Sequence, residues 1–211
     1  MPDRPPPASE ALQRLTEGNL RFVRQMSDPE SRPTVAGRLA LLEGQSPIAV
    51  VLGCSDSRVP VEIVFDQNLG DLFVIRVVGN IIAPSLVGSV EFAASKFGTR
   101  LVVVLGHSSC GAVISTIEEL RLAPGSQSPN LKAIVDRIRP HVEGVLAATD
   151  ASSDFHEVVS AAVRANISAS VAELRAGSEI LADLIANHGL QVVGAEYSLE
   201  SGIVTFLDSD S

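Results

Sequence analysis

Two short runs of the chain carry residue types that can bind a metal. They are Cys54–Arg58 (CSDSR) and His107–Gly111 (HSSCG). Two thiolates and one imidazole make a three-ligand zinc set, which is typical of catalytic sites that keep a fourth position open for water or substrate. The ligands would be Cys54, His107 and Cys110, and the chain has no other cysteine. In a reducing compartment, two such cysteines are more often metal ligands than a disulfide.

Each run follows an apolar stretch that predicts a buried β-strand. Residues 48–53 (IAVVLG) precede Cys54, and residues 101–106 (LVVVLG) precede His107. Ligand sites of parallel α/β sheets form at the carboxyl ends of strands. His107 and Cys110 are three residues apart, so one turn can direct both side chains to one point, and Cys54 joins them if the two strands are neighbours. The alternative interpretation is two buried structural cysteines and a hydrogen-bonded histidine.

The first run also contains a carboxylate and a guanidinium. Asp56 is two residues from Cys54, close enough to bind a metal or to hydrogen-bond its water. Arg58 can hold a carboxylate with two parallel hydrogen bonds. The alternative is a surface ion pair, which contributes little to stability.

The motifs CSDSRVP (54–60) and GHSSCGAV (106–113), with residues 62–80 between them, resemble β-class carbonic anhydrases. Weaker similarity begins at residues 11–23 and extends to 192–204. The resemblance implies reversible hydration of CO2 to bicarbonate and a proton by attack of zinc-bound hydroxide. It also implies one Zn2+ per chain and a homodimer or a dimer of dimers. Because two thiolates cancel the metal charge, we expect activity to increase toward alkaline pH.

By the same resemblance, Asp56 and Arg58 are the catalytic pair that orients the hydroxide and gates the site. When Asp56 pairs with Arg58, the metal is free for water. When it is released, Asp56 becomes the fourth ligand and closes the site. The family shows both arrangements.

Five further residues correspond to the substrate pocket of the family. Gln45 and Phe73 would reach the pocket from across the dimer interface, Gln45 as a hydrogen-bond donor and Phe73 as an apolar wall. Val59 and Gly79 would border the pocket, and Gly111 would offer a backbone N–H to an anion at a helix N-terminus. The alternatives are core packing for Phe73 and Val59, and a simple turn for Gly111.

Some family members hold a regulatory bicarbonate with an Arg, a Tyr and a Trp, and this ligand stabilises the closed form. Arg76 and Tyr197 match two of these positions, but Val51 stands in place of the Trp. We therefore expect the open form at neutral to alkaline pH, and a structural or interface role for Arg76.

Composition limits the partners. A net charge of −9 and a pI near 4.9 argue against nucleic acid or an anionic membrane, because both need a basic patch. The longest apolar runs are far shorter than a membrane span, and the polar, Pro-rich start does not resemble a signal peptide. We expect a cytoplasmic protein.

Apolar strands alternate with helical patterns, which predicts an α/β fold. Together with the resemblance, this gives a mostly parallel central sheet, four parallel strands plus an antiparallel edge strand, flanked by helices. We expect a flexible arm at 1–8, one zinc-dependent catalytic domain at 9–207 and a frayed tail at 208–211. Ser9 and Ser178 are the expected N-caps of two helices, and the helix after the third strand should start at Cys110.

Three competing functions remain open. Another zinc enzyme on this scaffold could act on CS2 or COS. A non-catalytic bicarbonate sensor, cut from a fused transporter, is a second alternative, although the intact Cys54, Asp56 and His107 argue against it. A redox protein is a third, but the cysteines lack the C-x-x-C spacing.

Three histidines lie outside any motif, namely His141, His156 and His188. They are expected to be solvated or helix-terminal, with a proton shuttle as the alternative.

Overall fold

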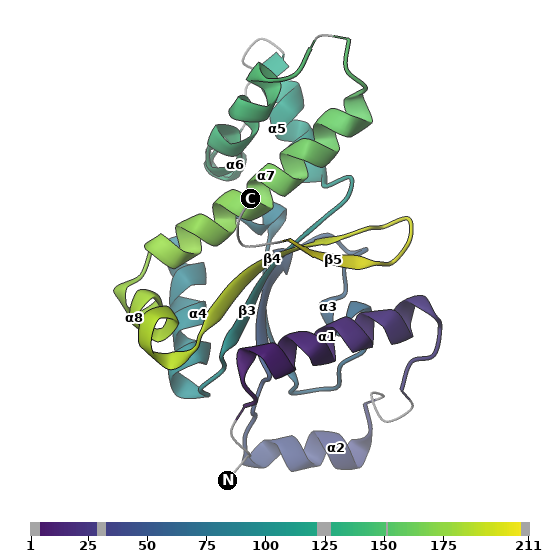
Figure 1. Cartoon of the computed structure of the whole chain (residues 1–211), viewed down its shortest axis with the longest axis vertical. Helices are drawn as coiled ribbons and strands as arrows, with labels where there is room; N and C mark the ends of the chain where they lie inside the picture. The colour runs from purple at the N-terminus through teal and green to yellow at the C-terminus, as the bar shows by residue number, and fades with distance from the viewer. Residues whose placement is uncertain (1–4, 29–32, 122–127, 151, 208–211) are drawn as a thin grey trace.

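The computed structural model describes residues 5–28, 33–121, 128–150 and 152–207. The expected tail at 208–211 and the first four residues of the expected arm therefore lie outside the described residues. Within these ranges the chain forms one five-stranded sheet flanked by helices (Figure 1).

The strands are β1 (Ala49–Cys54), β2 (Leu72–Val77), β3 (Leu101–His107), β4 (Gln191–Tyr197) and β5 (Val204–Leu207). Their order in the sheet is β2-β1-β3-β4-β5. The first four are parallel, and β5 pairs antiparallel with β4 at the edge. This confirms the predicted sheet.

Strands β1 and β3 are neighbours at the centre of the sheet, with Val51 paired to Val103. Every residue of both strands is buried. Continuous runs of β-branched residues are the expected pattern for strands covered on both faces. Because parallel neighbours end at the same edge, Cys54 and His107 come together there.

Helices cover both faces of the sheet. They are α1 (Ala8–Val23), α2 (Val35–Ala40), α3 (Val61–Val64), α4 (Pro84–Lys96), α5 (Gly111–Arg121), α6 (Pro129–Ala147), α7 (Phe155–Ala176) and α8 (Glu179–His188), with single 3-10 turns η2 (Leu41–Glu43) and η3 (Val78–Asn80). One core lies between the sheet and α4–α8, and a smaller core between the sheet and α1 with α3. In Figure 1, α1 crosses one face of the sheet and α2 lies beyond it, away from the strands.

Two helix starts differ from the sequence expectation. Helix α1 begins at Ala8 after Pro7, so Ser9 lies inside the first turn and is not the cap. Helix α5 begins at Gly111, which leaves Cys110 in the loop before it. The cap of α8 is confirmed, because the Ser178 hydroxyl accepts a hydrogen bond from the Leu181 amide.

Helix α1 closely approaches the end of α3 at Gly18. A Cβ atom at this position would lie 1.9 Å from the carbonyl oxygen of Phe65. Next to it, the buried Asn19 donates to the carbonyls of Val64 and Gly202. Gly18 therefore costs helix propensity but permits this contact.

None of the helices within the described ranges is both long and apolar enough to cross a membrane.

Candidate metal centre

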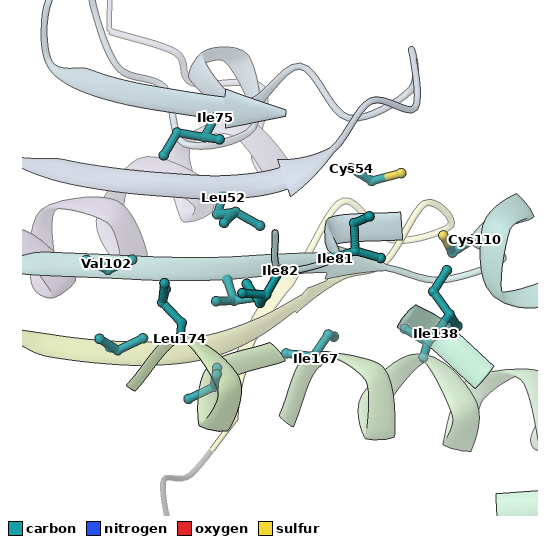
Figure 2. Close-up of a cluster of buried hydrophobic side chains, with 14 of the residues drawn as sticks. Leu52, Cys54, Ile75, Ile81, Ile82, Val102, Cys110, Ile138, Ile167 and Leu174 are labelled. Carbon is teal, nitrogen blue, oxygen red and sulfur yellow. The ribbon is translucent and has the colours of Figure 1, made fainter. Parts of the chain in front are cut away.

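The structure brings Cys54, His107 and Cys110 to one point at the carboxyl edge of the sheet. One ligand atom from each lies within 4.8 Å of the other two, and all three residues are buried. Cys54 ends β1, His107 ends β3, and Cys110 closes the loop before α5. Figure 2 shows the two sulfur atoms beyond the strand ends, with Ile138 below Cys110. Ligands about 2.0–2.3 Å from a tetrahedral zinc ion stand roughly 3.5–4 Å apart, which fits this cluster.

The imidazole of His107 is oriented as a ligand. Its Nδ1 lies 2.9 Å from the carbonyl oxygen of Ser108, which can only accept, so Nδ1 carries the proton. The lone pair is then on Nε2. This atom is buried and has no hydrogen-bond partner, although buried polar groups are normally satisfied. A metal ion would satisfy this atom, and an N–H held by a carbonyl is the usual support of a metal-bound histidine.

The two thiols influence each other's pKa. A hydrogen bond from the side chain of Cys110 lowers the pKa of Cys54 to about 4, against the opposing effect of burial. The same contact raises the pKa of Cys110. Cys54 is therefore the more easily ionised of the two thiols, and the thiolate is the metal-binding form.

Asp56 lies beside the cluster and is held by Arg58. Arg58 donates from Nε to Oδ1 at 2.9 Å and from Nη2 to Oδ2 at 2.7 Å, and its backbone N–H also reaches Oδ1 at 2.9 Å. These bonds hold the pKa of Asp56 well below its usual range. Oδ2 stands 3.8 Å from Nε2 of His107. The carboxylate is thus ionised and close to the ligands.

Two residues outside the motifs shape the loop after β1. Arg76 of β2 donates to the carbonyl oxygens of Cys54 and Asp56, which is a structural role, as expected. The N–H of Gly79 donates to Sγ of Cys54 at 3.3 Å. Sequence reasoning placed Gly79 no closer than the pocket border. The φ of Gly79 is +74°, in the left-handed region that disfavours residues other than glycine.

A cavity of about 430 Å³ opens at the cluster. Its wall includes Cys54, Asp56 and Gly111 on one side and the apolar Leu131, Ile134 and Val135 of α6 on the other. Gly111 is exposed and has open space around its Cα. The cavity therefore combines the metal-binding point with an apolar wall.

Three of the predicted pocket residues are not brought to this cavity within one chain. Gln45 is exposed beside α2, in a different hollow that Thr34 and Asp71 also line. Phe73 packs on Phe92 and Phe97. Val59 is fully buried in the core under α1 and α3.

The histidines outside the cluster differ from one another. His141 was expected to be solvated or helix-terminal, but it lies inside α6 with a side chain only 9% exposed. It bonds to Asn166 and Glu173. His156 is exposed in the first turn of α7. His188 ends α8 and pairs with Asp183.

Comparison with known proteins points to one family. A family described as carbonic anhydrase matches residues 49–204. Carbonic anhydrase 2 of Mycobacterium tuberculosis is 38% identical over 210 residues, which cover 99% of this chain and 96% of that protein.

Solved structures agree. The β-carbonic anhydrase CafA of Aspergillus fumigatus superimposes with a TM-score of 0.73 at 27% identity, covering 96% of this chain and 91% of the other. A tetrameric β-carbonic anhydrase of Sordaria macrospora has the same fold, with a TM-score of 0.73 at 23% identity, covering 94% and 97%. The matched region contains both metal-binding runs, and the chain therefore belongs to the β-carbonic anhydrase family of enzymes.

Proposed function

We propose that this protein catalyses the zinc-dependent, reversible hydration of CO2 to bicarbonate and a proton. The observation that carries the proposal is the unpartnered Nε2 of His107. It belongs to a buried cluster with Cys54 and Cys110 whose ligand atoms lie within 4.8 Å of one another, and Cys54 lines a largely apolar cavity. Cys54, His107 and Cys110 would hold one zinc ion per chain. A zinc ion in such a site lowers the pKa of bound water to near 7 and so supplies a nucleophile at neutral pH.

In this proposal, Asp56 orients the attacking water. Its carboxylate is ionised because Arg58 holds it, so it can accept a hydrogen bond and leave an oxygen lone pair directed at carbon. Arg58 fixes the plane of the carboxylate through two parallel bonds. Such bidentate pairing restricts orientation more than a single bond does.

The cavity provides the place for the substrate. CO2 is uncharged, and the side chains of Leu131, Ile134 and Val135 give it an apolar wall. Bicarbonate is an anion, and Gly111 is the first residue of α5, where backbone N–H groups lack helical partners. The substrate thus enters against α6, and the product forms beside the start of α5.

We further propose that Asp56 gates the site. Movement of Oδ2 away from Arg58 and toward the metal-binding point would fill the open coordination position. The 3.8 Å separation between Oδ2 and Nε2 of His107 makes the required displacement small. Pairing with Arg58 is the open state in this proposal.

The assembly that we propose is a homodimer or a dimer of dimers, with Gln45 and Phe73 completing the neighbouring subunit's pocket. Helix α2 supports this, because it buries no residue in the isolated chain. Its Val35 and Leu39 are 67% and 53% exposed, and Leu42 in the following turn is 79% exposed. A second copy of the chain would cover these side chains. We place the enzyme in the cytoplasm, where thiols stay reduced as this site requires.

Metal content and stopped-flow CO2 hydration test the proposal together. We expect one zinc per purified chain and hydration activity that a strong chelator removes. Cys110→Ala should lose zinc, whereas His188→Ala, which changes an exposed histidine at the end of α8, should keep it. Full zinc stoichiometry in Cys110→Ala would refute the ligand set. Turnover of CS2 or COS by a protein that does not hydrate CO2 would favour the alternative substrate class.

A further inference from the structure

A line of hydrogen bonds leads from the metal-binding point through the protein to its surface. Gly79 donates its N–H to Sγ of Cys54 at 3.3 Å. The carbonyl oxygen of Gly79 accepts from Nδ2 of Asn166 at 2.9 Å. Oδ1 of Asn166 lies 3.0 Å from Nδ1 of His141, and Nε2 of His141 lies 2.9 Å from the carboxylate of Glu173. These groups come from β1, η3, α7 and α6.

We propose that Asn166 is a positioning residue for the metal site. It fixes Gly79 as a hydrogen-bond donor to the Cys54 sulfur and so sets the zinc affinity of the site. His141 and Glu173 hold Asn166 in the required orientation. The inference rests on the proposed function, since it assumes that Cys54 is a zinc ligand. It concerns side chains 87 to 119 residues after Cys54, outside both metal-binding motifs.

The donor and acceptor order of this line is fixed by chemistry. The Gly79 carbonyl can only accept, so the Asn166 amide must direct its NH2 group to it and its oxygen to His141. Nδ1 of His141 is then the donor to Asn166. Asn166 is 1% exposed, so a reversed amide would face two unfavourable contacts that water could not relieve. A buried polar group left without its partner costs about 1–3 kcal/mol.

Gly79 is a position that needs such support. Its φ of +74° lies in the left-handed region, and glycine has many other accessible conformations. A Cβ atom here would lie 2.7 Å from Cδ1 of Ile138 and 3.1 Å from Cβ of Ala112. Contacts with α5 and α6 therefore exclude a residue with a Cβ atom at this position. The hydrogen bonds at the N–H and the carbonyl of Gly79 fix the orientation of its backbone.

A hydrogen bond to a thiolate ligand changes the metal site. It stabilises negative charge on sulfur and orients the sulfur lone pairs, so its loss alters both the affinity and the electronic structure of the metal. Groups that support ligands in this way typically change metal affinity by about 10- to 100-fold when they are removed.

The chain offers a matched control. Ser170 lies one turn after Asn166 on α7, is fully buried, and donates to the carbonyl of Asn80, the residue after Gly79. Ser170→Ala therefore removes a buried bond from the same helix to the same turn without touching Gly79. Asn166→Asp keeps the size of the side chain and its acceptor for His141 but removes the NH2 donor.

The experiment measures zinc affinity by chelator competition, and the absorption spectrum of the Co2+-substituted protein, in full-length variants. We expect Asn166→Ala and Asn166→Asp to weaken zinc binding by about 10- to 100-fold. We expect their sulfur-to-cobalt charge-transfer band to move to longer wavelength, because the sulfur electrons are held less tightly. His141→Ala should show a smaller change in the same direction, and Ser170→Ala should match the wild type.

Two results would overturn the inference. In the first, both Asn166 variants have the same zinc affinity and the same cobalt spectrum as Ser170→Ala. The other is an equal loss in Ser170→Ala, which would show that any weakening of the turn suffices. If Asn166→Ala does not fold, Asn166→Asp and His141→Ala decide the question by the same two readouts. Failure of the wild-type protein to bind zinc would instead refute the proposed function.

Discussion

Arg58 holds both carboxylate oxygens of Asp56, and the oxygen bound by its Nη2 atom also stands 3.8 Å from Nε2 of His107. The carboxylate therefore lies between a guanidinium and a metal-binding point. Asp56 cannot keep both hydrogen bonds to Arg58 and bind a metal ion at the same time, because the bidentate contact fixes the plane of its carboxylate.

The first prediction concerns the two members of this pair. Asp56→Asn should lower CO2 hydration by about 10²–10⁴-fold, the range for loss of a positioned proton acceptor, while zinc stays bound. Arg58→Ala should also lower the rate. Without Arg58 the pKa of Asp56 returns toward an ordinary carboxyl value, about 3.9, so Asp56 stays ionised at pH 7 and the loss reflects orientation. Stopped-flow rates with zinc analysis would check this, and near-wild-type rates in either variant would contradict it.

A second prediction concerns the resting state. Arg76 donates to the carbonyls of Cys54 and Asp56, and Val51 is buried in β1 without an indole to close a regulatory pocket. A ligand shifts a conformational balance only through different affinities for its states. We expect a zinc-loaded crystal structure at pH 8 to keep Asp56 on Arg58. Asp56 bound to zinc at that pH, or cooperative inhibition by bicarbonate, would be evidence against this.

A third prediction tests the contact between α1 and the end of α3. Gly18→Ala places a Cβ atom 1.9 Å from the Phe65 carbonyl, and the backbone must move to relieve it. We expect a loss of about 1–3 kcal/mol in the free energy of unfolding. Gly144→Ala is the matched control, because this helical glycine has open space around it, and alanine should add about 0.5–1 kcal/mol there. Thermal unfolding of the zinc-loaded variants would measure both, and equal stabilities would contradict the prediction.

The sheet could be predicted because its strands are short apolar runs separated by helical patterns. Burial of β1 and β3 on both faces leaves little choice of residue, so the valine runs identify these strands. The ligand set followed from the same placement, since neighbouring parallel strands end at one edge. The start of α1 was missed because Pro7 occupies the cap position, where Ser9 was the stronger sequence signal.

The interactions around Gly79 could not be predicted from the sequence. Asn166 lies 25 residues from His141 and 87 residues from Gly79 in sequence, and only tertiary packing brings these residues together at the turn. A single chain also leaves Gln45 away from the cavity. Its predicted role depends on a second copy, which one sequence does not place.

The last prediction tests whether Gln45 acts across the subunit interface. Gln45→Ala should keep zinc and lose about 10-fold in hydration rate, the value of one hydrogen bond to substrate.

The decisive measurement uses heterodimers, purified with two tags, of one Gln45→Ala subunit and one Asp56→Asn subunit. If Gln45 serves the neighbouring site, both defects fall on one site and the other site is intact, so activity returns. Heterodimers of Asp56→Asn with Arg58→Ala are the control, because each of those changes disables its own subunit. Recovery in the first pair alone supports the shared site. No recovery in either, or a monomer with full activity, would mean that each chain works alone.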